Sequence, residues 1–266
     1  MSTVRPTLCI IPAYVRSAEE LDVLLRCLVS LQATAPDANV LVVDDGRPVE
    51  ELSAHLELAC EELGVGYVDN DENSGFSKTV NVGLELALAT EQDAVLVNAD
   101  IEFPAAGWLD RMRERTDTEG RPAAVVGARL LYPNGLLQHA GVFFSLLSRD
   151  WLHRFRMGPG NLPEALTPTR CIVTGALQFI RWETLEALGF YDEGYRLCYE
   201  DVDYCLRVFQ AGLECIYEPS VVAMHHESYF RKTQSPKIKQ WTIESAERMR
   251  RLWGGEDLSR WVPETL

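Results

Sequence analysis

Short apolar segments alternate with helical segments over the first hundred residues, and this alternation limits the fold more than any other feature. Apolar runs predict buried strands at Thr7–Ile11, Val40–Val43 and Ala94–Val97, with a shorter strand near Tyr67. Leucines at helical spacing predict a helix that begins near Ser17, and further helices are expected over 49–63 and around Leu84. Uniformly apolar strands between helices favour a mostly parallel sheet with helices on both faces, an α/β fold.

Polar or turn-forming residues follow three of these strands directly. They are Pro12-Ala13-Tyr14, Asp44-Asp45 and Asn98-Ala99-Asp100. In open α/β sheets, ligands bind at the carboxyl ends of the strands. We therefore expect a binding site that these three segments share.

The pattern changes after about residue 127. A Pro133-Asn134-Gly135 turn between Leu130–Tyr132 and Leu136–Phe144 predicts a hairpin. Residues 145–170 show no period and are expected to form a binding loop. Further expected elements are a strand at Cys171–Arg181, helices at Trp182–Leu188 and Glu200–Gln210, and two strands at 213–217 and 221–225.

Composition limits the class of protein. The 266 residues suit one large domain or a domain with an appendage, and the net charge of −15 argues against a broad phosphate-binding surface. The seven cysteines are scattered and contain no C-x-x-C pair, which indicates reduced thiols. Without a signal-peptide pattern or a membrane-length apolar run, we expect a cytoplasmic protein.

The C-terminal tail, residues 231–266, differs chemically from the rest. Between Arg231 and Arg251, seven Lys and Arg residues stand against Glu244 and Glu247, with apolar residues at helical steps. The tail is interpreted either as a helix packed on the domain or as a contact region. The contact would be with an anionic lipid surface or lipid diphosphate, another subunit, or a polyanion such as nucleic acid, through residues 231–253.

Seven motifs in order resemble the family 2 glycosyltransferases, which are inverting, metal-dependent enzymes of GT-A fold. The resemblance covers about residues 6 to 230. It rests on Ile10-Ile11-Pro12-Ala13-Tyr14, Val42-Val43-Asp44-Asp45-Gly46, Asn73-Ser74-Gly75-Phe76 with Asn81-Val82-Gly83, Asn98-Ala99-Asp100, Gly189-Phe190-Tyr191-Asp192-Glu193, Glu200-Asp201 and His225.

The resemblance implies a division of the chain. It implies a GT-A catalytic domain over 1–230, with a Rossmann-like nucleotide-binding half (1–105) and an acceptor-side half (106–230) containing a small antiparallel sheet. Residues 231–266 would form the basic, amphipathic tail.

The resemblance also implies a site for Mn²⁺ or Mg²⁺. A hard divalent cation held by oxygen ligands would offset the charge of a leaving diphosphate. The implied ligands are Asp100 and His225, with Asn98 in support. His226 ranks second, because adjacent strand residues face opposite sides. A histidine buried in the core is the alternative for His225.

The implied donor is a UDP, dTDP or GDP sugar. Its expected contacts are Pro12, Ala13, Tyr14, Asp44, Asp45, Asn73, Gly75, Lys78, Asn98, Ala99 and Asp100. A simple turn is the alternative for Asp44-Asp45-Gly46, and a solvated helix charge for Lys78. Arg16 and Arg47 depart from the family pattern, and we expect both to bear on base and sugar preference.

Asp201 matches the family's general base, and Glu200 accompanies it at the start of a helix. Capping of that helix is the alternative role for this pair. Asp203, four residues before Arg207, is expected in a surface ion pair. Gly175 is expected beside donor or acceptor, and Trp151 and Arg154, with His153 and Arg156, in a lid, with an exposed loop as the alternative.

The leading hypothesis is an inverting glycosyltransferase that moves a sugar to a hydroxyl of a saccharide, lipid-linked or other acceptor, either in the cytoplasm or peripheral at the membrane face. A sugar-1-phosphate nucleotidyltransferase is the enzyme alternative, although Pro12–Ser17 has none of the glycines its phosphate loop needs. A non-catalytic nucleotide-sugar-binding module is the alternative outside enzymes.

Overall fold

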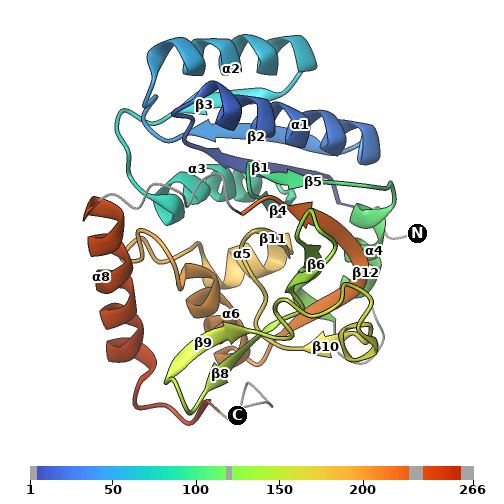
Figure 1. Ribbon diagram of the computed structural model, residues 1–266, viewed down its shortest axis with the longest axis vertical. Coiled ribbons are helices and arrows are strands. Elements are labelled where there is room, and N and C mark those ends of the chain that lie inside the picture. Colours follow the sequence, from blue (N-terminus) through green and yellow to red (C-terminus); the bar gives the residue numbers. More distant parts are fainter. Residues whose placement is uncertain (1–4, 118–121, 228–235, 259–266) are drawn as a thin grey trace.

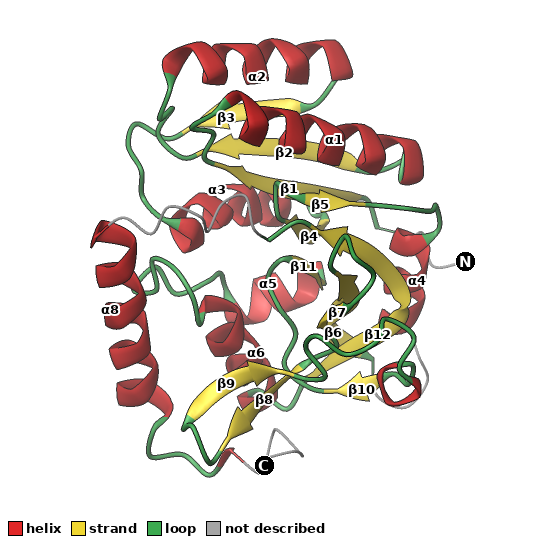
Figure 2. Cartoon of the chain, in the orientation of Figure 1, coloured by secondary structure: helices red, strands yellow, loops and turns green. Residues whose placement is uncertain are grey.

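The computed structural model describes residues 5–117, 122–227 and 236–258, which form two half-domains around one mixed sheet (Figures 1 and 2). The strands of its main path are β1 (Thr7–Ala13), β2 (Asn39–Asp44), β3 (Gly66–Asp69), β4 (Asp93–Val97), β6 (Ala123–Leu131), β10 (Thr169–Arg170), β11 (Leu177–Ile180) and β12 (Glu214–His225). Their order across the sheet is β10-β12-β6-β11-β4-β1-β2-β3.

The first half is the predicted parallel sheet. Strands β4, β1, β2 and β3 pair in parallel, with Ile10 opposite both Leu41 and Leu96. The helices are α1 (Ala18–Thr34), α2 (Glu50–Leu63) and α3 (Phe76–Ala89). Leu8 and Ile10 of β1 pack in one core cluster with α3, while Cys9 and Ile11 pack in the other with α1 and α2. Both faces of β1 are therefore buried, which explains its uniformly apolar sequence.

The second half joins this sheet through β11, which inserts antiparallel between β4 and β6. Its helices are α4 (Trp108–Thr116), α5 (Trp182–Leu188) and α6 (Glu200–Gln210). A two-residue strand, β5 (Ile101–Glu102), pairs with the end of β12, so that Ile101 lies opposite His225. This pairing brings the segment after β4 to the segment that ends β12, although they are over a hundred residues apart.

One strand replaces the two expected at 213–217 and 221–225. β12 runs from Glu214 to His225 beside β6, with a register shift between Glu218 and Val222. Pro219 lies inside the shift, and a proline lacks the N–H that a regular ladder requires. The chain therefore bulges at Pro219 and continues, where we predicted a break.

The region after β6 also differs from the prediction. The predicted hairpin forms between β6 and β7 (Leu137–His139), but the expected strand Leu136–Phe144 is interrupted at Gly141, where φ is +99°. A Cβ at Gly141 would lie 2.5 Å from Sγ of Cys171, so the chain can turn here only with glycine. After the turn, β8 (Val142–Ser145) pairs with β9 (Asp150–His153) in a separate two-stranded sheet.

Residues 145–170 are consequently more ordered than the irregular loop we expected. They contain β9, a 3₁₀ turn at Pro163–Ala165 and β10. The predicted strand Cys171–Arg181 is shortened to Leu177–Ile180. Residues 173–176, directly before this strand, are therefore not part of the sheet ladder.

The tail contains helix α8 (Pro236–Trp253), and the interpretation of a helix packed on the domain is confirmed for these residues. Trp241, Met249 and Trp253 are buried, and Arg248 forms an ion pair with Asp192. Residues 231–235 and 259–266 lie outside the described part of the chain. None of the described helices combines the length and the apolar character that crossing a bilayer requires.

Candidate active site

The carboxyl ends of β1, β2 and β4 lie side by side, because β1 pairs in parallel with both neighbours. Asp44, at the end of β2, is fully buried, and its Oδ2 accepts a hydrogen bond from the hydroxyl of Tyr67 at 2.9 Å. Within the described residues, Asp44 Oδ1 has no hydrogen-bond partner, nor do the side-chain oxygens of Asn73 and Asn98. Leaving one such oxygen unpaired costs about 1–3 kcal/mol. Two of them at the ends of β2 and β4, and the third in the loop after β3, indicate a site whose partners come from a ligand.

Asp45 shapes the loop after β3. Its Oδ1 accepts from the backbone N–H of Ser74 at 2.8 Å and from the amide of Asn70, and its Oδ2 accepts from the N–H of Gly75. Gly46 packs so closely on this loop that a Cβ would lie 2.4 Å from the nitrogen of Asn73. Asp45 therefore fixes the backbone of the expected nucleotide-binding loop through hydrogen bonds.

The other expected donor contacts from the first half are placed as follows. Pro12 and Ala13 end β1, with Tyr14 directly after them, and Lys78 is exposed in the first turn of α3. Both arginines that depart from the family pattern are ion-paired. Arg16 pairs with Glu20, and Arg47 lies among Glu50, Glu57 and Asp69.

Asp100 and His225 meet where β4 and β12 end. Nε2 of His225 lies 3.0 Å from Oδ1 of Asp100, and both side chains are buried. The amide nitrogen of Asn98 lies 3.4 Å from the same Nε2. His226 points elsewhere, toward Glu102 at 3.2 Å, as the alternation of a strand requires.

The donor set at this point fits a divalent cation that shares its coordination with a substrate. It comprises the Asp100 carboxylate and the His225 imidazole, with the side-chain amide of Asn98 beside them in support. Within the described residues no three His, Cys, Asp or Glu side chains gather as a closed metal site. Mg²⁺-type ions are commonly bound by one or two carboxylates with substrate phosphates filling other positions. An open site of this kind matches that requirement.

The candidate base lies close to this donor set. Oδ2 of Asp201 accepts from the N–H of Gly175 at 2.9 Å, and the oxygen of the next residue, Ala176, accepts from the N–H of Asn98 at 2.8 Å. Two consecutive residues thus hold Asp201 on one side and Asn98 on the other. A Cβ at Gly175 would lie 3.1 Å from the hydroxyl of Tyr191 and 3.4 Å from Cβ of Asp201, so glycine allows this close approach.

Asp203 differs in its surroundings from the surface ion pair we expected. Its bond to Nε of Arg207 forms, at 2.9 Å, but the Asp203 carboxylate is buried. Burial becomes tolerable because the indole N–H of Trp253 and the hydroxyl of Tyr195 also donate to it. Asp203 therefore ties α8 to α6. Glu200 is buried at the start of α6.

The expected lid residues lie on or next to the β8–β9 hairpin. Trp151 is half-buried on β9, with its ring 5.1 Å from that of Phe144. Arg154 is buried, and its backbone N–H donates to the oxygen of Gly141. Arg156 forms an ion pair with Glu227. The exposed-loop alternative is wrong for Arg154, because its side chain lies in the interior.

One residue next to His225, Gln138, was missed. Oε1 of Gln138 lies 2.6 Å from Nδ1 of His225, and the Gln138 amide donates to Glu227 at 3.2 Å. Gln138 stood in a predicted strand without a motif around it. Only the pairing of β7 with β6 and of β6 with β12 brings it to the histidine, so no local signal could have identified it.

The two half-domains have the fold of GT-A glycosyltransferases. The fold matches the structure of GalNAc-T7 with UDP, GalNAc and Mn²⁺ at a TM-score of 0.61 and 16% identity, over 85% of this chain and 44% of that one. It also matches the mannosyltransferase PcManGT from Pyrobaculum calidifontis in complex with GDP-Man and Mn²⁺. That TM-score is 0.62 at 17% identity, over 98% of this chain and 68% of that one.

The chain belongs to glycosyl transferase family 2, whose family model matches residues 8–165. It is 32% identical over 161 residues to the O-antigen biosynthesis protein RfbC of Myxococcus xanthus, a match covering 58% of this chain and 12% of that protein. It is 28% identical over 74 residues to the rhamnosyltransferase WbbL of Escherichia coli, 28% of each chain. The chain thus spans only a small part of the curated relatives it matches.

Proposed function

We propose that the chain transfers a sugar from a nucleoside diphosphate sugar to an acceptor hydroxyl, with inversion at the anomeric carbon and with Mn²⁺ or Mg²⁺ at Asp100 and His225. One observation carries the proposal. Gly175 and Ala176, adjacent in the chain, hold the candidate base Asp201 and the candidate metal-site residue Asn98 through backbone hydrogen bonds of 2.9 and 2.8 Å. A base and a diphosphate site must lie this close for one sugar carbon to react between them.

A divalent ion bound at this site would supply positive charge to the departing diphosphate. Residues of the chain itself orient the groups that would bind this ion and the donor. Gln138 would accept from Nδ1 of His225, and the lone pair of Nε2 would then be directed at the position next to Asp100. Asp44 and Asn73 offer their unpaired oxygens to the nucleoside part of the donor. The UDP and GDP carriers seen with the structural neighbours fit such contacts, and the proposed donors are UDP, dTDP or GDP sugars.

Asp201 is proposed to take the proton of the acceptor hydroxyl. The acceptor oxygen bonds to the anomeric carbon as the bond from that carbon to the diphosphate oxygen breaks, and the nucleoside diphosphate leaves. Each oxygen of Asp201 accepts one backbone N–H, from Val202 and from Gly175, and keeps a second lone pair for the proton. The helix start at which Asp201 lies favours its negative charge.

The test compares Asp201→Asn with Glu200→Gln. Asparagine keeps the size of Asp201 and can still accept from Gly175, but it is too weak a base to take the proton. We expect sugar transfer to fall about 10²–10⁴-fold while nucleotide affinity in the presence of Mn²⁺ stays unchanged. Glu200→Gln should cost less. Transfer by Asp201→Asn within a few-fold of the parent would exclude Asp201 as the base.

A further inference from the structure

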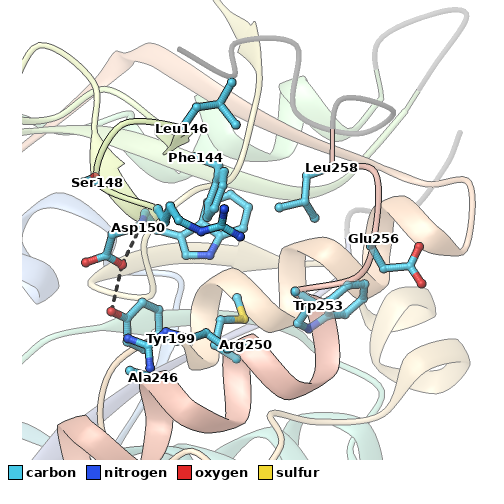
Figure 3. A pocket seen from close by; sticks show the side chains of 14 residues that line it. Phe144, Leu146, Ser148, Asp150, Tyr199, Ala246, Arg250, Trp253, Glu256 and Leu258 are labelled. Carbon is cyan, nitrogen blue, oxygen red and sulfur yellow. Dashed lines mark hydrogen bonds between the residues drawn. The ribbon is translucent and has the colours of Figure 1, made fainter.

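A cavity of about 540 Å³ lies between the β8–β9 hairpin and the C-terminal half of α8 (Figure 3). Asp150 and Tyr199 lie on one side of it, and Trp253 and Glu256 on the other. Tyr199 is also the residue that directly precedes α6, so the next two residues of the chain are Glu200 and Asp201. Tyr199 therefore joins this cavity to the first turn of α6, which carries the candidate base.

The backbone next to that wall is strained. Cys198 and Tyr199 have φ of +67° and +70°, in the left-handed region, which costs a non-glycine residue about 1–2 kcal/mol. The ring of Tyr199 is then fixed by its hydroxyl, which donates to Oδ1 of Asp150 at 2.9 Å. Burial and the Asp150 carboxylate raise the pKa of Tyr199, so this hydroxyl stays a donor near neutral pH. The strained backbone at Cys198 and Tyr199 and the hydrogen bond to Asp150 together hold the ring of Tyr199 in one orientation.

The chemistry of the lining is mixed in a particular way. Phe144, Trp151 and Tyr199 offer aromatic surface, and the rings of Phe144 and Trp151 meet edge to face at 5.1 Å and 63°. Both signs of charge are present as well. The cations are Arg149 and Arg250, and the anions are Asp150 and Glu256.

The combination of aromatic rings with charges of both signs favours some classes of ligand over others. A hydrocarbon chain would leave four charged groups desolvated, which is unfavourable. A phosphate or diphosphate would approach two carboxylates in a protein whose net charge is −15. A sugar ring has an apolar C–H face for an aromatic surface and hydroxyls that both donate and accept. A cavity of this size suits a ligand of about the size of a disaccharide.

We propose that this cavity is an acceptor subsite that binds a neutral saccharide of one or two sugar rings, with a ring stacked on Trp151 and a hydroxyl reaching past Tyr199 to Asp201. The proposal rests on the proposed function, because it takes Asp201 as the base. It names the acceptor class for that same site.

The experiment uses the full chain and two variants from one hairpin. Trp151→Ala removes the stacking surface, whereas Leu147→Ala changes a side chain that is 96% exposed at the hairpin tip and does not line the cavity. The probes are methyl glycosides of disaccharides containing hexose, 6-deoxyhexose and N-acetylhexosamine units. Binding is read by saturation-transfer NMR, and transfer and donor hydrolysis are read separately.

We expect at least one probe to bind the parent, Trp151→Ala to weaken its binding and raise its KM about tenfold or more, and Leu147→Ala to change neither. Donor hydrolysis should be equal in the parent and Leu147→Ala, and Trp151→Ala should lose much less of it than of transfer. Tyr199→Phe, which loses the bond to Asp150, should fall between parent and Trp151→Ala.

The contrary outcomes separate the two proposals. If no probe binds the parent, or if Trp151→Ala binds and transfers like the parent, the acceptor subsite is overturned while donor hydrolysis can still support the proposed function. If a probe binds through Trp151 but no nucleotide sugar is hydrolysed, the saccharide site stands and the proposed function fails. Sedimentation with 3:1 phosphatidylcholine–phosphatidylglycerol vesicles that depends on Leu147, without saccharide binding, would assign this face to lipid and overturn the subsite.

Discussion

Nδ1 of His225 lies 2.6 Å from Oε1 of Gln138, and the amide group of Gln138 donates to Glu227. Because the amide nitrogen of Gln138 donates to Glu227, the oxygen of Gln138 faces the histidine and accepts from Nδ1 in the tautomer that carries its hydrogen there. Nε2 is then left with its lone pair beside Asp100. Partners of this kind orient the histidine ligands of metals in general.

Replacing Gln138 by leucine should weaken metal binding without removing a ligand. We expect Gln138→Leu to lower Mn²⁺ affinity, in the presence of nucleoside diphosphate, about 10–100-fold. Titration calorimetry measures this directly. The side chain is buried, so circular dichroism must first show that the variant is folded. An unchanged affinity would mean that His225 needs no partner, or is no ligand.

The two adjacent histidines should differ in the same assay. His225→Ala removes a side chain 3.0 Å from Asp100, whereas His226→Ala removes one that faces Glu102. We expect the first variant, like Asp100→Ala, to lose most Mn²⁺-dependent nucleotide binding, and the second to retain it within about threefold, as for a side chain outside the site. Equal losses would place the metal elsewhere.

Helix α8 should contribute to stability through one hydrogen bond. Trp253→Phe keeps a buried aromatic ring but removes the N–H that Asp203 accepts at 2.8 Å. A hydrogen bond to a charged group contributes about 1.5–3 kcal/mol, so we expect the urea midpoint to fall by a corresponding amount.

Trp241→Phe is the matched control, because it keeps an aromatic ring under Arg196 on the same helix. It should change the midpoint much less than Trp253→Phe. Equal shifts in the two variants would show that ring size, and not the bond to Asp203, sets the loss.

The cysteines should react unequally. Burial raises the pKa of Cys9, Cys60 and Cys171 to about 12, which keeps these thiols protonated and unreactive at pH 8. Of the seven cysteines, only Cys198 is not fully buried. We expect iodoacetamide to modify one thiol in the native protein and seven in urea, counted by mass spectrometry. Modification of several thiols in the native protein would contradict the buried, reduced state.

The parallel half of the fold could be predicted because its signals are local. Leucine spacing in α1, the Ser17 cap that accepts from Glu20, and the apolar run of β1 each lie within one segment. The second half could not be predicted where its local structure depends on residues that are distant in the sequence. The bulge at Pro219 exists because β6 runs beside β12 on both sides of it, and the break at Gly141 depends on Cys171.

The site divides in the same way. Asp100, Asp201 and His225 stood in motifs at strand or helix ends, and the structure brings the surroundings of all three together. Gln138 stood in no motif, and Tyr199, which directly precedes Glu200-Asp201, was given no role of its own. Their positions follow from strand pairing and from a left-handed backbone that the residues Cys198 and Tyr199 do not themselves favour.

The bond between Trp253 and Asp203 also sets an order of events during synthesis. Nearly all the residues of the β4-β1-β2-β3 sheet and its helices leave the ribosome within the first hundred positions, so that half can fold early. The half that carries Asp201 completes its buried contacts later, because the Asp203 carboxylate accepts from an indole fifty residues further along the chain. A nascent chain should therefore form the proposed nucleoside contacts of Asp44 and Asn73 before the surroundings of Asp201 are complete, whereas the proposed metal site at Asp100 and His225 needs both halves.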